Sequence, residues 1–177
     1  MLNDVDEPTL PSRPWRVDEQ YAAELELERS RWKAITAFVD LLSADERLAP
    51  GYYHDPDWSV KDLIGHLGRW MVEARVQLLD IAARSYVPHE VDVEALNAAT
   101  LAELKAQRWD RVWTGTNDAR AWMLEAWFAL NGPSEAANGW IRKAGAEHYG
   151  EHLGRLRDWV AELIELRNRP VVDEWEG

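Results

Sequence analysis

The chain has 177 residues, which suits a single domain with a sizeable core, and 46% of the residues are apolar against 29% charged. A formal net charge of -12 repels phosphate backbones and anionic lipid surfaces, so we expect no nucleic-acid partner and no membrane partner. The absence of Cys excludes disulfides and thiolate ligands, and with no apolar signal segment it favours a cytoplasmic protein.

The first predicted elements are an extended lead-in and a long helix. Three prolines among polar neighbours predict an extended segment over residues 1–16, with Trp15 available to dock on the fold. Apolar residues then recur at intervals of three and four, which predicts a helix over residues 17–42. The proline, glycine and aspartate residues of 43–58 indicate an ordered crossing. The apolar positions of the first helix are Tyr21, Leu25, Leu27, Trp32, Ile35, Phe38, Val39 and Leu42.

A second helix is predicted to begin at Ser59. Asp62 follows three residues later, a spacing typical of a capping box at a helix N-terminus. Pro88 indicates the end of this helix shortly before it. The next stretch divides near Arg108 into a short helix over 91–107 and a third long helix over 109–130 with Trp122 in its apolar stripe. The stripe of the second helix is Leu63, His66, Leu67, Trp70, Met71, Ala74 and Leu78.

The last helix is predicted over residues 136–166, after the stop signal Asn131-Gly132-Pro133. Its stripe comprises Ile141, Gly145, His148, His152, Leu156, Trp159, Leu163 and Leu166. No strand-like alternation competes with the helical patterns. The sequence therefore predicts an all-α four-helix bundle over residues 17–167, followed by a loose tail over 168–177.

Three histidines lie on predicted inward faces and form a candidate metal site. His148 and His152 are four residues apart, so their imidazoles share one helix face. His66 lies on the stripe of the second helix, from which a neighbouring position could bring it opposite the pair. A polar core network is the competing interpretation, because an isolated His on an apolar face is more often a core residue than a ligand.

A three-histidine site would keep an open coordination position, which is the arrangement of a catalytic rather than a structural ion. Water or a thiolate could take that position, and the sequence does not choose between them. Glu73 and Glu151 are candidate bases or hydrogen-bond partners of the ligands, with ordinary surface solvation as the alternative for each. His54 and His89 lie in predicted loops and are expected to be ordinary surface residues.

Two segments resemble the DinB/YfiT-like superfamily: WSVKDLIGHL at residues 58–67, and HYGEHLGRLRDW at residues 148–159. Together with DVEALN at residues 92–97, they look most like the ClbS/DfsB family. The resemblance implies an up-down-down-up four-helix bundle, with a long connection between its second and third helices. It also implies a homodimer and a Zn or Ni ion on His66, His148 and His152.

Members of this superfamily differ in function, so the resemblance leaves several functions open for this chain. The superfamily that the sequence resembles includes transferases that use a low-molecular-weight thiol, a hydrolase that opens an electrophilic ring, and members without known activity. We therefore expect a metal-dependent stress or detoxification enzyme that acts on a small electrophilic substrate. A bundle that binds a small ligand or a metal without turnover is the alternative, and a vestigial histidine cluster is a third.

Overall fold

The structure is a computed structural model that describes residues 19–132 and 134–169. The predicted lead-in over 1–16 with its Trp15, and almost all of the predicted tail, lie outside the described residues.

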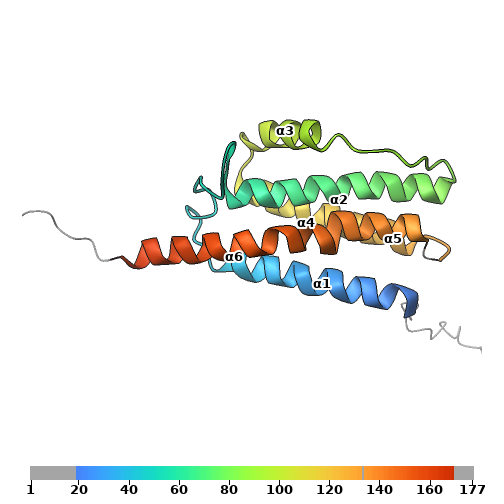
Figure 1. The fold of residues 1–177 in the computed structure, drawn as a ribbon, viewed down its shortest axis with the longest axis horizontal. Helices are drawn as coiled ribbons and strands as arrows, with labels where there is room; N and C mark the ends of the chain where they lie inside the picture. Colours follow the sequence, from blue (N-terminus) through green and yellow to red (C-terminus); the bar gives the residue numbers. More distant parts are fainter. Residues whose placement is uncertain (1–18, 133, 170–177) are drawn as a thin grey trace, which may run out of the picture.

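The described chain is mostly helical, as predicted, and its long helices lie side by side along one axis (Figure 1). In this view α1 and α6 run in one direction, whereas α2 and α4 run in the opposite direction. The helices are α1 (Glu19–Asp40), α2 (Val60–Ala83), α3 (Val93–Leu104), α4 (Trp109–Phe128), α5 (Glu135–Ile141) and α6 (Glu147–Asn168). A π-helical turn, Arg142–Ala146, joins α5 to α6.

The crossing between α1 and α2 contains a small hairpin that the sequence pattern did not predict. Strand β1 (Tyr53–His54) pairs antiparallel with β2 (Asp57–Trp58), and Tyr53 lies opposite Trp58. Two-residue strands are too short for any alternation to be visible in a sequence. The guanidinium of Arg155 on α6 donates to the backbone carbonyls of Tyr52 at 2.8 Å and Gly51 at 3.0 Å. These bonds hold the crossing against α6.

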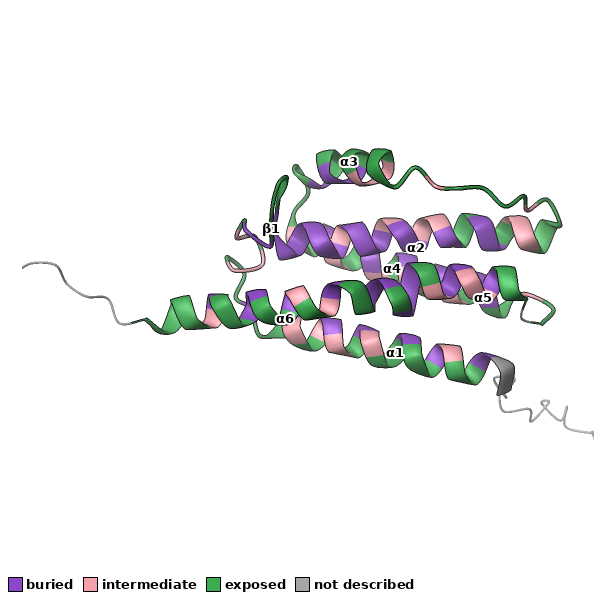
Figure 2. Cartoon of the chain, viewed as in Figure 1, coloured by how far each residue is buried: buried purple, intermediate pink, exposed green. Residues whose placement is uncertain are grey.

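Helix α2 is the central element, and most of its first half is buried (Figure 2). Its predicted capping box is present: the Ser59 hydroxyl accepts from the Asp62 amide, and the Asp62 carboxylate accepts from the Ser59 amide at 2.8 Å. Gly68 lets α4 approach, because a Cβ atom at this position would lie 2.5 Å from the hydroxyl oxygen of Thr116. That hydroxyl donates to the carbonyl of Ile64 at 2.9 Å and so links the two helices.

The short helix α3 packs on α2, on the side away from α1 (Figure 1). The Asp92 side chain caps its N-terminus by accepting from the Ala95 amide at 3.0 Å. At its other end the ammonium of Lys61 donates to the carbonyl of Leu104 at 2.8 Å. The Leu104 side chain occupies the space that a side chain at Gly65 would take, because its Cδ2 atom would clash with an added Cβ. These contacts fix α3 against the N-terminal half of α2.

The predicted last helix over 136–166 is wrong in one respect, because it is not continuous. The Glu147 amide donates to the Arg142 carbonyl five residues earlier, and Gly145 has non-helical dihedral angles of -113° and -108°. The carboxylate of Glu28 fills the adjacent space; it is fully buried and accepts from Arg120 at 2.6 Å and from the Tyr149 hydroxyl at 3.1 Å. A Cβ at Gly145 would lie 3.3 Å from the Cγ of Glu28. The helix therefore changes register where it passes this buried charge.

Three apolar residues that we expected on inward stripes are instead exposed: Leu27, Trp122 and Leu166. Trp122 lies on the outer surface, where the guanidinium of Arg75 is 5.6 Å from its ring centroid. On α1 the neighbouring Glu28 is buried in place of Leu27, because Arg120 neutralises it. Among the described residues, no helix combines the length and the apolar character needed to cross a membrane.

Candidate metal centre

The structure brings the three predicted ligands together from two helices. His66 lies in the buried half of α2, and His148 and His152 lie in the first turns of α6, directly after the π-helical turn. Their side chains are almost completely buried, with exposed fractions of 5%, 7% and 9%. One nitrogen from each imidazole lies within 4.8 Å of the others, so the group could hold a metal ion.

The spacing of the nitrogens fits a small divalent ion after modest side-chain movement. The Nε2 atoms of His66 and His148 are 2.8 Å apart. The ring centroids of the three pairs are 4.7, 5.3 and 5.1 Å apart. Tetrahedral metal–nitrogen bonds of about 2.0–2.1 Å separate two ligand nitrogens by roughly 3.3 Å. The pair at 2.8 Å would therefore open slightly, and the limit of 4.8 Å for all three pairs leaves shifts of about 1.5 Å at most, which side-chain torsions can supply.

Burial keeps the three imidazoles neutral. It lowers the pKa of His66 from 6.5 to about 3, with a further contribution from His152 and an opposing one from a polar contact with Asn97. The pKa of His148 falls to about 2, through burial and then through the other two histidines. Burial alone lowers the pKa of His152 to about 4. Neutral imidazole is the form that binds a metal, so the cluster needs no proton release to become a ligand set.

Aromatic side chains surround the cluster and orient its rings. The hydroxyl of Tyr53 lies 3.2 Å from the Nδ1 atom of His152, and the buried Tyr52 hydroxyl lies 3.4 Å from the same atom. Trp58 packs edge-on against His66 with 5.1 Å between ring centroids, and Trp70 packs in the same way against His148 at 5.6 Å. The hairpin and α2 thus supply walls that restrict water around the imidazoles.

A cavity of about 520 Å³ opens onto the three histidines. Glu151 is among its lining residues and is exposed to solvent, so it lies at the mouth of the cavity. Glu73 is not among them, and its carboxylate accepts a hydrogen bond from Gln77 at 2.9 Å, so the structure gives it no contact with the site. Besides the histidines, the lining comprises Tyr53, Asp55, Pro56, Trp58, Trp70, Val93, Asn97, Lys143, Glu147 and Glu151.

Lys143 is the cation in this lining, and two indole rings hold it. Its ammonium lies 5.2 Å from the ring centroid of Trp70 and 5.1 Å from that of Trp140. Such contacts stabilise a cation by about 0.5–2 kcal/mol. Trp70 therefore contacts both a candidate metal ligand and the lysine in the cavity wall.

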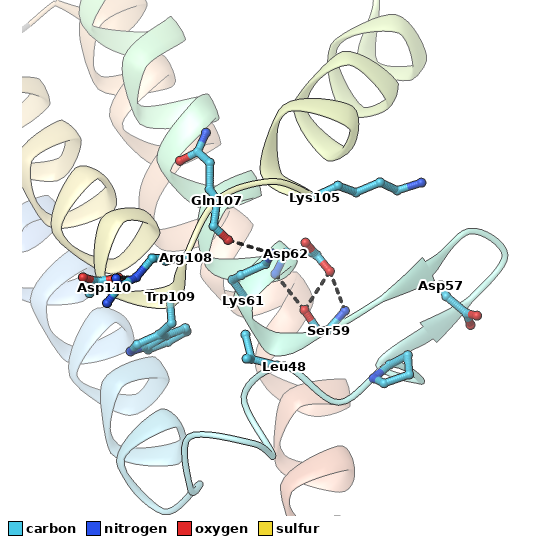
Figure 3. A pocket seen from close by; sticks show the side chains of 11 residues that line it. Leu48, Asp57, Ser59, Lys61, Asp62, Lys105, Gln107, Arg108, Trp109 and Asp110 are labelled. Atoms are coloured by element: carbon cyan, nitrogen blue, oxygen red, sulfur yellow. Dashed lines mark hydrogen bonds and ion pairs between the residues drawn. The ribbon is translucent and has the colours of Figure 1, made fainter.

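A second cavity, of about 680 Å³, lies where the N-termini of α2 and α4 approach the end of α3 (Figure 3). Several of its charged groups are engaged in local bonds. Asp62 accepts from Ser59, Lys61 donates to the carbonyl of Gln107 at 3.1 Å, and Arg108 pairs with Asp110 at 3.1 Å. The Lys61 bond links the start of α2 to the segment between α3 and α4, whereas the other two are local to one helix start, and we assign the cavity no ligand.

Sequence reasoning identified the three histidines of this group but missed most of their surroundings. His54 and His89 are exposed and outside the cluster, as predicted. Tyr52 and Tyr53 were missed because they lie in the crossing, whose path over α6 depends on Arg155 about 100 residues later. The adjacent tyrosines just before a predicted helix were the one available signal. Comparisons of the chain with family models, with curated proteins and with solved structures give no match.

Proposed function

We propose that this chain is a metal-binding protein of the DinB/YfiT-like type, with a Zn or Ni ion on His66, His148 and His152. One observation carries the proposal: three buried, neutral imidazoles converge beside a cavity of about 520 Å³. A polar core network needs no such opening. Imidazole nitrogen suits both metals, and three protein ligands leave a position free for a further group.

We further propose that the site is enzymatic and acts on a small electrophile by thiol transfer or by hydrolysis. When bound, the ion would supply Lewis-acid chemistry. The rings of Trp58 and Trp70 would bind the apolar part of the substrate and exclude bulk water. The Glu151 carboxylate, which lines the same cavity, is placed to accept a proton. A low-molecular-weight thiol is the candidate second cofactor.

The arrangement of the helices supports an up-down-down-up four-helix bundle in which α3 belongs to the long connection between α2 and α4. We also propose a homodimer, as the resemblance of the sequence implies. Light scattering of the purified protein at micromolar concentration should give twice the chain mass of 20.4 kDa. A mass of one chain would reject the dimer without affecting the metal site.

The experiment for the metal site is elemental analysis of untagged protein, with titration of the metal-free form by Zn²⁺ and Ni²⁺. We expect about one ion per chain, and we expect the double variant His148→Ala, His152→Ala to lose it. His54→Ala is the matched control, because it removes an exposed imidazole outside the cluster. Full metal content in the double variant would show that the proposed ligands are wrong.

Turnover separates the enzyme from a bundle that only binds its ligand. Metal-loaded protein is incubated with a panel of electrophiles, with and without low-molecular-weight thiols. Hydrolysis should need no thiol, whereas transfer should require it, and His66→Ala should lose either activity while keeping its helical dichroism. Metal binding without turnover of any electrophile would favour the non-catalytic alternative.

A further inference from the structure

Asn97 is the polar residue that α3 contributes to the cavity beside His66, and Val93 is its apolar neighbour in the lining. Its side chain contacts His66 and opposes the burial effect on the pKa of that imidazole. The Oδ1 atom of Asn97 and the Nδ1 atom of His66 are both buried, and neither forms a hydrogen bond of good geometry with any described residue. The two atoms are therefore available to each other, a buried acceptor beside a ring nitrogen that can carry a proton.

The contact made by the other ring nitrogen of His66, Nε2, decides whether Nδ1 carries the imidazole proton. The Nε2 atoms of His66 and His148 are 2.8 Å apart, so one of them is a donor and the other an acceptor. In the amide orientation of the structure, a His66 proton on Nε2 would leave a bare Nδ1 beside the Asn97 oxygen, so that two buried acceptors would oppose each other. With the proton on Nδ1, His66 donates toward Asn97 and its Nε2 accepts from His148.

We propose that Asn97 is a positioning residue that holds His66 in the tautomer protonated at Nδ1, so that the Nε2 lone pair is presented to the centre of the cluster. The tautomer is a property of the metal-free protein. Only its expected effect on metal affinity rests on the proposed metal site. Histidines that bind metals commonly donate their second ring N–H to an oxygen acceptor, which fixes the ring and raises its basicity.

The placement of Asn97 depends on the docking of α3 rather than on the bundle itself. Lys61 bonds the C-terminal carbonyl of Leu104, and the Leu104 side chain fills the notch at Gly65, one residue before His66 on α2. The same stretch of α2 thus carries the ligand and the docking site for the helix that orients it. A shift of α3 would remove the acceptor without disturbing His148 or His152.

The deciding experiment measures the tautomer of His66 in metal-free protein near neutral pH, by long-range proton–nitrogen correlation of the histidine rings. His66→Gln assigns the signals. Wild type should show the proton on Nδ1, and so should Asn97→Asp, which keeps an oxygen acceptor. Asn97→Leu and Asn97→Ala should lose this preference. Asn117→Leu is the matched control, because its amide donates to a carbonyl of its own helix, at 2.8 Å, and it lies outside the lining of the cavity.

Metal affinity provides the second measurement. Loss of such an acceptor typically weakens metal binding about 10–100-fold, so Asn97→Leu and Asn97→Ala should bind Zn²⁺ or Ni²⁺ more weakly by that factor. Asn97→Asp should restore binding. An unchanged tautomer in both removal variants, or affinities within about twofold of wild type, would overturn the proposal. If wild type binds no ion, the proposed function fails, and the tautomer still decides the role of Asn97.

Discussion

Acid should destabilise the metal-free protein well before its surface carboxylates titrate. The pKa values of His66, His148 and His152 are lowered by burial to about 3, 2 and 4, from 6.5 in an accessible chain. As the pH falls below 6.5, the unfolded chain therefore takes up protons that the folded chain refuses. The stability is fully present above the unfolded pKa and is lost progressively as the pH falls toward the folded values.

The size of this effect follows from the proton uptake. Each buried histidine lowers the free energy of unfolding by about 1.4 kcal/mol per pH unit once the pH is well below 6.5. Between about pH 7 and pH 5.5 this amounts to about 1.3 kcal/mol for each group and about 4 kcal/mol for the three. That is a large part of the roughly 5–15 kcal/mol that stabilises a domain of ordinary size.

Urea unfolding with a chelator present, followed by far-UV dichroism at both pH values, measures the difference. In the variant His148→Leu, His152→Leu the loss should shrink to about a third, because one titrating group remains. The control His54→Gln should behave as wild type. A change below about 1 kcal/mol in wild type, or an equal change in the double variant, would refute the reasoning about the buried neutral cluster.

Two further predictions concern packing. Glu28→Gln should lower the free energy of unfolding by about 3 kcal/mol or more, because it leaves the Arg120 guanidinium without its buried carboxylate. Glu24→Gln, at the partly exposed pair with Arg142, should change the free energy of unfolding by less than about 1 kcal/mol. Similar losses in the two variants would contradict this expectation. Gly68→Ala should cost about 1–3 kcal/mol by forcing α2 and α4 apart, measured by urea unfolding. Gly154→Ala, which meets open space in mid-helix, should instead be neutral or stabilising.

The sequence predicted the helix ends well where residues close in the chain determine them. The Ser59 capping box placed the start of α2 correctly, and periodicity alone located α1 and α4 to within a few residues. The interruption of the last helix could not be predicted in this way. It accompanies a buried carboxylate, Glu28, whose partner Arg120 lies 92 residues away in the sequence. Nothing in the local sequence indicates that Glu28, rather than the neighbouring Leu27, is the buried residue.

The residues of the candidate site also differ in whether local sequence or long-range packing places them. His148 and His152 share a helix face, so their proximity follows from helical geometry, whereas the approach of His66 depends on how two distant helices pack. The place of His66 on the apolar stripe of the second helix suggested it as the third candidate ligand, and the resemblance of the surrounding segments supported that choice. Asn97 reaches the cavity only because α3 docks on α2, and no periodic pattern encodes the path of the connection that carries it.

The π-helical turn at Arg142–Ala146 makes the site depend on the length of a segment as well as on its residues. A π turn accommodates one residue more than a regular α-helical turn, and each residue of an α-helix rotates the chain by about 100°. Deleting one residue between α5 and α6 would allow a straight helix with equal helical content. It would also rotate His148 and His152 away from His66 relative to α5. An insertion or deletion in this stretch should therefore separate the histidines even where it leaves the helical content unchanged.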